Sequence, residues 1–286
     1  MKLLLAAAAL SLLATAPQAR SLELKASRTS AFDLALSGKL AGVAPGETRY
    51  VSWSELRALP TTRLMLDGEF VKGSQELTVV FLSDLWAALP VAPGADALFA
   101  TCGDGYAGIY TSTFISHYRP FLVLEINGKG PGDWPPPGLT FNPAPYVITV
   151  SKALAPDASK FLDIEHKKPW GVQKIEIASF GESFRGIYSG KWADPGPAAA
   201  AGREIWLNSC ASCHPGPSGI FGGTKSERPF PVIAAYAAYD RPFFMKYVRD
   251  PKSLVASAKM EAHPRYTDEQ MAQLMAFITI GAAPAP

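Results

Sequence analysis

The chain has 286 residues, with 27 basic and 25 acidic side chains and a formal net charge of +2. This balance argues against nucleic-acid binding and against a strongly basic membrane-binding surface. Three cysteines are poor material for a disulfide framework. The chain is longer than a single small domain with one hydrophobic core, and this length favours two domains.

The amino terminus has the pattern of a secretory signal peptide. Lys2 precedes an almost wholly apolar run, residues 3–16, which ends in small residues. We expect residues 1–19 to be removed on export to the periplasm, leaving a mature chain that starts near Arg20 or Ser21; a retained anchor is the alternative. No later stretch reaches the roughly 18 apolar residues of a membrane helix.

Residues 22–180 predict a mixed α/β region with Gly and Pro between its elements. Two short helices are expected at 52–60 and 81–90, where a Ser precedes an acidic residue and a Pro ends the segment. Six runs rich in apolar and β-branched residues predict strands: 48–53, 76–82, 97–102, 121–126, 146–150 and 172–177.

The composition changes after this region. A stretch rich in Pro, Gly and Ala predicts a linker at residues 186–197. The remaining residues are expected to form helices, one over 240–251 and the clearest over 267–281. In the latter, Thr267 and Gln270 form a capping-box pattern. One apolar face and a terminal glycine follow: Met271, Leu274, Met275, Ile278 and Gly281.

The segment WLNSCASCHPGP, residues 206–217, carries the strongest chemical signal. Cys210 and Cys213 are separated by two residues, and His214 follows directly. Cys-x-x-Cys-His is the sequence signal for c-type haem attachment. Thiols at this spacing can reach the two vinyl groups on one edge of a porphyrin, and the adjoining imidazole can then bind the iron. Export is consistent with this chemistry.

Two other interpretations of the motif are weaker. A thioredoxin-like dithiol is expected near a βαβ pattern, whereas this motif ends an alanine-rich helix. A structural zinc site needs four ligands, and the chain has no second cysteine pair. Cys102 is left alone, and we expect it to be a buried free thiol in a strand.

The motif and its flanks resemble a class I cytochrome c over residues 198–286. AGREIWLNSCASCH, residues 201–214, is similar to the family's first helix and haem motif, with Gly202 where the family's first and last helices cross closely. TDEQMAQLMAFIT, residues 267–279, resembles the final helix, with Phe277 as its aromatic residue. The resemblance implies a small all-α domain with one covalent haem c.

The axial ligand opposite His214 also follows from this resemblance. VRDPKSLVASAKM, residues 248–260, is similar to the segment that brings an axial methionine to the iron, which implies Met260. His263 in the same loop is the rival, and an open or water-bound site is the third possibility. The other candidates are interpreted as core residues: Met245, Met271 and Met275. A His/Met pair raises the haem potential relative to two histidines.

Residues 50–180 resemble the oxidoreductase molybdopterin-binding domain of the sulfite oxidase superfamily. The segments that carry this resemblance are VSWSELRALP, VVFLSDLWAALP, FATCGDGYAGIY, FLVLEINGKG and KKPWGVQKIEI. The resemblance implies a mixed α/β fold for this part of the chain.

The sequence departs from that family where its chemistry lies. Catalytic members supply a molybdenum-binding cysteine before VVFLSDLW, but residues 65–78 contain none, and Cys102 comes after it. Candidates for the pterin phosphate are sparse and form no recognisable cluster: Arg119, His117 and His166. We therefore expect a relative without molybdopterin, retained as a docking or ligand-binding module.

Together these features predict an α+β protein, in which a sulfite oxidase-like domain at 22–185 is joined by the linker at 186–197 to a cytochrome c domain at 198–286. The expected function is single-electron transfer through one haem c, held by Cys210, Cys213, His214 and Met260, to periplasmic redox partner proteins. The alternatives are a fused molybdopterin enzyme that oxidises a small oxyanion such as sulfite, and a ligand sensor with an open haem position.

Overall fold

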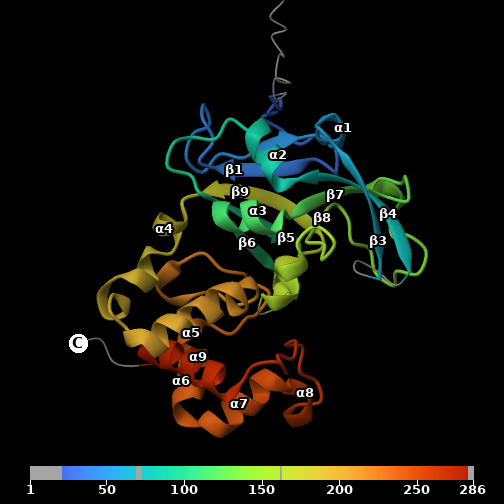
Figure 1. Ribbon diagram of the computed structural model, residues 1–286. Coiled ribbons are helices and arrows are strands. Elements are labelled where there is room, and N and C mark those ends of the chain that lie inside the picture. The colour runs from blue at the N-terminus through green and yellow to red at the C-terminus, as the bar shows by residue number, and fades with distance from the viewer. Residues whose placement is uncertain (1–20, 69–72, 162, 283–286) are drawn as a thin grey trace, which may run out of the picture.

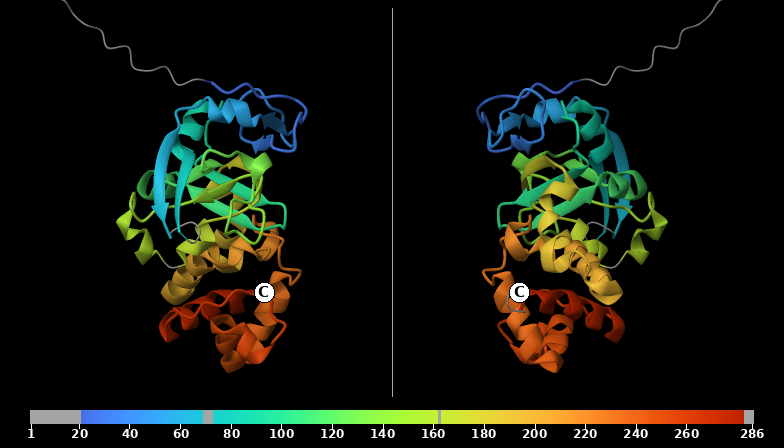
Figure 2. Two further views of the ribbon diagram at one scale, coloured as in Figure 1. Left: turned by 90° about the vertical axis from the view of Figure 1, so that its right-hand side faces the viewer. Right: turned by 90° about the vertical axis from the view of Figure 1, so that its left-hand side faces the viewer.

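The computed structural model describes residues 21–68, 73–161 and 163–282. The predicted signal peptide, residues 1–19, lies outside the described residues. The described residues form two β-sheets and nine α-helices, a mixed architecture compatible with the α+β class. Figures 1 and 2 show the sheets in the upper part of the molecule and the C-terminal helices beneath them. No described helix is both long and apolar enough to span a membrane.

The first sheet has five strands in the order β2-β1-β9-β5-β6. Strands β1 and β9 are parallel, and the other neighbours are antiparallel. Its strands are β1 (Leu34–Gly38), β2 (Arg49–Val51), β5 (Ala97–Cys102), β6 (Ala107–Thr111) and β9 (Val172–Ala178).

The second sheet has four antiparallel strands in the order β3-β4-β7-β8. Its strands are β3 (Thr62–Asp67), β4 (Ser74–Phe81), β7 (Phe121–Ile126) and β8 (Val147–Thr149). All six strands predicted from apolar runs are confirmed, whereas β1, β3 and β6 were not among them. Strand β3 lies at a sheet edge and exposes Met65, so its residues do not form the apolar run that signals a buried strand.

Side chains alternate between the two faces of each strand, and both faces are covered. In β5, Leu98 and Ala100 face the core between the two sheets, while Ala97 and Phe99 face the C-terminal helices. The outer face of the four-stranded sheet packs on Trp134. Phe99 stacks on Phe221 with ring centroids 4.2 Å apart. The outer face of the five-stranded sheet therefore shares a core with the C-terminal helices.

Three short helices accompany the sheets: α1 (Trp53–Arg57), α2 (Leu82–Ala88) and α3 (Ser112–Tyr118). The first two confirm the predicted helices. Ser52 and Glu55 form a capping box at the start of α1. Helix α2 ends just before Leu89 and Pro90.

The C-terminal part of the chain is helical, as predicted. Its helices are α4 (Phe180–Ser183), α5 (Gly196–Asn208), α6 (Phe230–Tyr239), α7 (Arg241–Arg249), α8 (Pro251–Leu254) and α9 (Asp268–Ile280). Helices α7 and α9 confirm the two predicted ones, and Thr267 and Gln270 form the expected capping box. The predicted core face of α9 is buried: Met271, Leu274, Met275 and Ile278.

Short 3-10 turns complete the fold. They are η1 (Pro131–Asp133), η2 (Pro156–Lys160), η3 (Ile164–Lys167), η4 (Arg185–Tyr188), η5 (Gly190–Trp192), η6 (Cys210–Ser212) and η7 (Pro217–Gly219). Two of them lie in the stretch predicted as a linker, residues 186–197, where Ile187 and Trp192 are buried. This segment packs against both sheet and helices.

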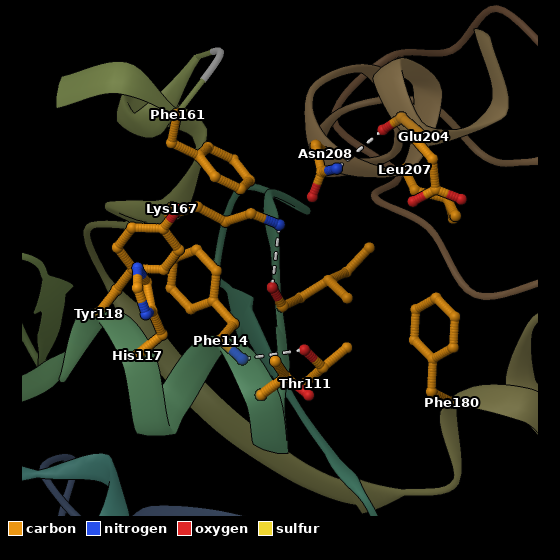
Figure 3. Close-up of a pocket in the computed structure, with 12 residues that line it drawn as sticks. Thr111, Phe114, His117, Tyr118, Phe161, Lys167, Phe180, Glu204, Leu207 and Asn208 are labelled. Atoms are coloured by element: carbon orange, nitrogen blue, oxygen red, sulfur yellow. Dashed lines mark hydrogen bonds between the residues drawn. The ribbon is translucent and has the colours of Figure 1, made fainter. Parts of the chain in front are cut away.

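A buried lysine lies between these two parts of the molecule. Lys167 is 2% exposed, and its Nζ donates to the carbonyl oxygen of Ile109 at 3.0 Å and lies 5.5 Å from the ring centroid of Phe114. It lines a pocket of about 340 Å³ together with residues of α3 and α5 (Figure 3). Burial lowers the pKa of Lys167 to about 7.

Lys167→Met is expected to raise the free energy of unfolding at neutral pH by about 1–3 kcal/mol, because a buried amine is replaced by an apolar side chain of similar length. The unfolded chain holds the lysine proton up to about pH 10, whereas the folded chain releases it near pH 7. The Lys167 contribution to the unfolding free energy of the wild type therefore rises with pH between these values, most clearly below about pH 8.5, where the cysteines of the unfolded chain are still protonated. Urea unfolding across this range should show the rise in the wild type and in Lys252→Met, an exposed control, but not in Lys167→Met.

Candidate functional site

A compact turn after α5 brings the cysteine motif together. The amide groups of Cys213 and His214 both donate to the carbonyl oxygen of Cys210, at 3.1 and 2.9 Å. The segment that follows the turn also holds it in place. The backbone N–H of Ser226 donates to the carbonyl oxygen of Cys213 at 2.9 Å. The alanine-rich helix thus ends at the motif, as predicted.

The two thiols of the motif are unpaired and partly buried. Burial raises the pKa of Cys213 to about 11, and it also raises the pKa of Cys210. Both side chains are therefore thiols at neutral pH, and they form no disulfide with each other. Two adjacent free thiols are the groups that thioether bonds to haem vinyl groups consume.

His214 is a neutral imidazole in this environment. Burial is the main cause that lowers its pKa to about 4, and the backbone of Arg228 acts in the opposite direction. Its Nδ1 is buried and has no hydrogen-bond partner among the described residues. The Trp206 ring lies 6.1 Å away, and its Nε1 is likewise buried without a partner in that part of the chain.

Buried polar atoms without partners are rare in proteins, because each costs about 1–3 kcal/mol. The unpartnered Nδ1 of His214, next to two free thiols, is consistent with a further group bound at this place, whereas the indole N–H of Trp206 can only donate a hydrogen bond. A neutral imidazole is also the form that coordinates iron. The side chains of the motif, Cys210, Cys213 and His214, therefore fit a covalently attached haem.

Helices α5 and α9 cross closely beside the motif. A Cβ atom built on Gly202 would lie 1.9 Å from the carbonyl oxygen of Gln273, so only glycine fits there. This confirms the predicted close approach of the first and last helices. Phe277 is fully buried next to Trp206, with ring centroids 6.3 Å apart.

The candidates for the second axial position lie in different surroundings. Met260 is partly buried and packs against the same core as Cys210. His263 is instead engaged by Asp163, with Nδ1 and Oδ2 3.1 Å apart. The other methionines belong to the helices: Met271 and Met275 are fully buried in α9, and Met245 packs against the core from α7.

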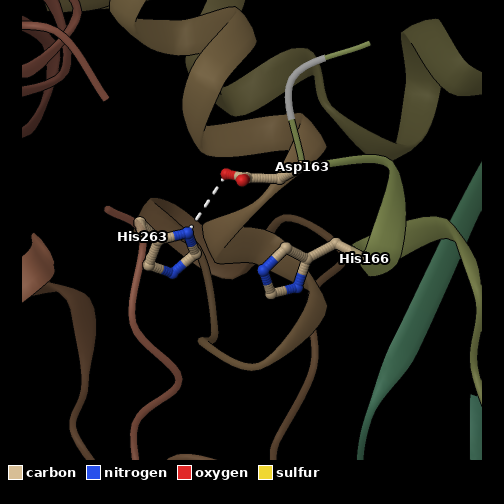
Figure 4. A group of neighbouring side chains, drawn as sticks. All are labelled: Asp163, His166 and His263. Carbon is tan, nitrogen blue, oxygen red and sulfur yellow. Dashed lines mark hydrogen bonds and ion pairs between the residues drawn. The ribbon is translucent and has the colours of Figure 1, made fainter. Parts of the chain in front are cut away.

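A polar cluster that the sequence analysis missed joins the motif to the sheets. Ser209, one residue before Cys210, donates to Asp163 Oδ2 at 2.9 Å, and Asp163 also contacts His263. His166 stacks on His263 at 5.1 Å between ring centroids (Figure 4). Asp163 and His263 are 100 positions apart, and no local pattern links them.

A second contact joins the loop after β5 to the segment after the motif. Thr224 donates its backbone N–H to the carbonyl oxygen of Gly105 at 2.8 Å, and Lys225 pairs with Asp104 at 2.9 Å. Gly105 has φ +84°, and a Cβ there would meet Thr224 Oγ1 at 2.6 Å. The segment that follows the cysteine motif therefore lies against the sheet part of the molecule.

The residues considered for a molybdopterin have separate partners. His117 is exposed and pairs with Asp157 at 2.6 Å, and the Arg119 guanidinium lies 4.6 Å from the ring centroid of Phe81. His166 belongs to the cluster with His263. Burial raises the pKa of Cys102 to about 12, so this residue is a buried thiol. His117, Arg119 and His166 are thus each engaged by a different partner.

Comparison with known proteins adds a limited similarity. No protein-family model matches the chain, and no curated protein matches it. Among solved structures, the sulfane dehydrogenase SoxCD from Paracoccus pantotrophus is similar at 16% identity and a TM-score of 0.36, over 54% of this chain. The similar part spans 40% of that chain, which is well under its full length.

Proposed function

We propose that the protein is a periplasmic c-type cytochrome that transfers single electrons to and from partner proteins. Cys210 and Cys213 would hold one haem through thioether bonds, and His214 and Met260 would bind its iron. The observation that carries this proposal is the neutral His214 ring, with its buried and unpartnered Nδ1, directly after two free thiols.

Bound haem supplies the one-electron chemistry, and the chain positions it. The α5–α9 crossing at Gly202 holds the helix that leads into the motif. The aromatic side chains of Trp206, Phe230 and Phe277 pack together beside His214 and exclude water from that side. A thioether from Met260 favours the reduced iron, which raises the potential relative to a second imidazole.

The sheet part has a supporting role in this proposal. It contacts the motif through Asp163 and through the Asp104–Lys225 pair. Its candidate pterin ligands do not converge on one site. We propose that it acts without a molybdopterin as a docking module for the redox partner.

The test is production of the full chain in a host that attaches haem covalently in its periplasm. The denatured, acid-extracted polypeptide should be coloured and heavier by the mass of one haem. Elemental analysis should give one iron per chain and no molybdenum. A colourless polypeptide without added mass would overturn the proposal, whereas stoichiometric molybdenum would favour the fused enzyme.

Met260→Ala is expected to remove the weak sulfur-to-iron absorption at the red edge of the oxidised spectrum, while the haem stays attached. Loss of the thioether should also lower the potential and open the position to imidazole or carbon monoxide. Met271→Leu is the control, because Met271 is fully buried in the core face of α9. Persistence of the band in Met260→Ala would show that another group binds the iron.

A further inference from the structure

Three buried side chains from opposite parts of the molecule meet between the sheets and the helices. Asp163, His166 and His263 each offer a ligand atom, and these atoms all lie within 4.8 Å of one another. The three side chains are 6–7% exposed. Figure 4 shows one ring nitrogen of His166 directed toward the other two side chains. The cluster is therefore enclosed and its donor atoms converge.

The ionisation states suit a metal cation. Burial opposes the charge on Asp163, but its contacts with His263 and Ser209 outweigh that effect and hold its pKa well below the ordinary value. Burial lowers the pKa of His166 to about 4, with the neighbouring His263 as a smaller cause. At neutral pH the cluster thus contains a carboxylate and a neutral imidazole.

We propose that Asp163, His166 and His263 form a binding site for one divalent transition-metal ion of the Zn²⁺ type. Two imidazole nitrogens and one carboxylate oxygen are a donor set that such ions prefer. Water would occupy the fourth position. The ion would tie the turn around Asp163 to the loop that carries His263 and, three residues earlier, Met260.

One donor pair already has the spacing of metal ligands, and the His166 nitrogen, which lies within 4.8 Å of the other two donor atoms, would move toward them. Donors at about 2.0–2.1 Å from a tetrahedral ion are roughly 3.3 Å apart, and Nδ1 of His263 is already 3.1 Å from Oδ2 of Asp163. Zn²⁺ would take the place of the hydrogen between these two atoms, and the neutral His263 ring would carry its hydrogen on Nε2 instead. Arg265, 3.7 Å from Asp163 Oδ1, is half exposed and can turn toward water when the ion binds.

Surrounding groups already orient the ligands. The hydroxyl of Tyr106 lies 3.1 Å from Nδ1 of His166, which leaves the other ring nitrogen for an ion. The hydroxyl of Ser209 donates to Asp163 Oδ2 at 2.9 Å. Polar partners of this kind hold metal ligands in the binding orientation, and their loss typically weakens metal affinity 10- to 100-fold.

The test uses the full, haem-loaded chain, stripped with a chelator and titrated with zinc chloride near pH 7.5. We expect one zinc per chain by elemental analysis and a zinc-dependent rise in melting temperature. Asp163→Asn and His166→Gln should each weaken zinc binding at least tenfold. His117→Gln is the matched control, because His117 forms an exposed pair with Asp157 and should leave zinc binding unchanged.

The site does not depend on the haem proposal, and the outcomes separate the two. Iron is measured separately from zinc, and the Cys210→Ala/Cys213→Ala chain should still bind zinc, which excludes the thiols as ligands. If a histidine variant does not fold, Asp163→Asn gives the same comparison. Zinc binding that is absent from the wild type, or equal in the wild type and the Asp163 and His166 variants, would overturn the proposal.

Discussion

Replacement of both Cys210 and Cys213 by alanine is expected to abolish covalent haem attachment. The denatured double variant should be colourless and have the mass of the bare mature polypeptide, because no other thiol lies at the spacing of the two vinyl groups. Gel electrophoresis with a haem stain and intact mass measurement would check this result. This effect is the largest we expect, since it converts the proposed cytochrome into a chain without its redox group.

Three further variants make this result specific. Each single variant retains one thiol and should attach haem through a single thioether, at reduced yield and with a shifted reduced spectrum. Cys102→Ala should attach haem fully, because Cys102 is a buried thiol at the end of β5 outside the motif. Haem that remains attached in the double variant would show that the proposed linkage is wrong.

Gly202→Ala is expected to lower the free energy of unfolding by about 3 kcal/mol, at the upper end of overpacking effects. The added Cβ would lie 1.9 Å from the carbonyl oxygen of Gln273 and force α5 and α9 apart. Intrinsic helix propensity acts the other way, because alanine is favoured over glycine by about 1 kcal/mol in a helix. The sign of the change therefore reports the helix crossing directly, and urea unfolding would measure it.

Gly181→Ala is the matched control for this variant. Gly181 lies in the short helix α4, is exposed, and has no atom within 4 Å of an added Cβ. The free energy of unfolding of the Gly181→Ala variant should be unchanged or rise by up to about 1 kcal/mol, because only the helix propensity of alanine acts there. Equal stability of the Gly202 and Gly181 variants would contradict the close crossing.

Much of the local structure could be predicted from the sequence. The buried strands β4, β5 and β7 stand out as apolar runs, and the capping box of Thr267 and Gln270 marks the start of α9. The proposal of a haem site also came from the sequence, because the Cys-x-x-Cys-His signal depends on spacing within five residues. These features depend only on residues that are close together in the sequence, so they can be recognised without a structure.

Only the tertiary structure decided which segments, distant from one another in the sequence, come into contact. The apolar run of β5 indicates a buried strand, but it does not reveal that Phe99 would meet Phe221 in a core shared with the helices. Nor does any local pattern place Asp163 next to His263. The physical reason is that hydrogen-bond periodicity and motif spacing act over a few residues, whereas contacts between distant segments are chosen by the packing of the whole chain.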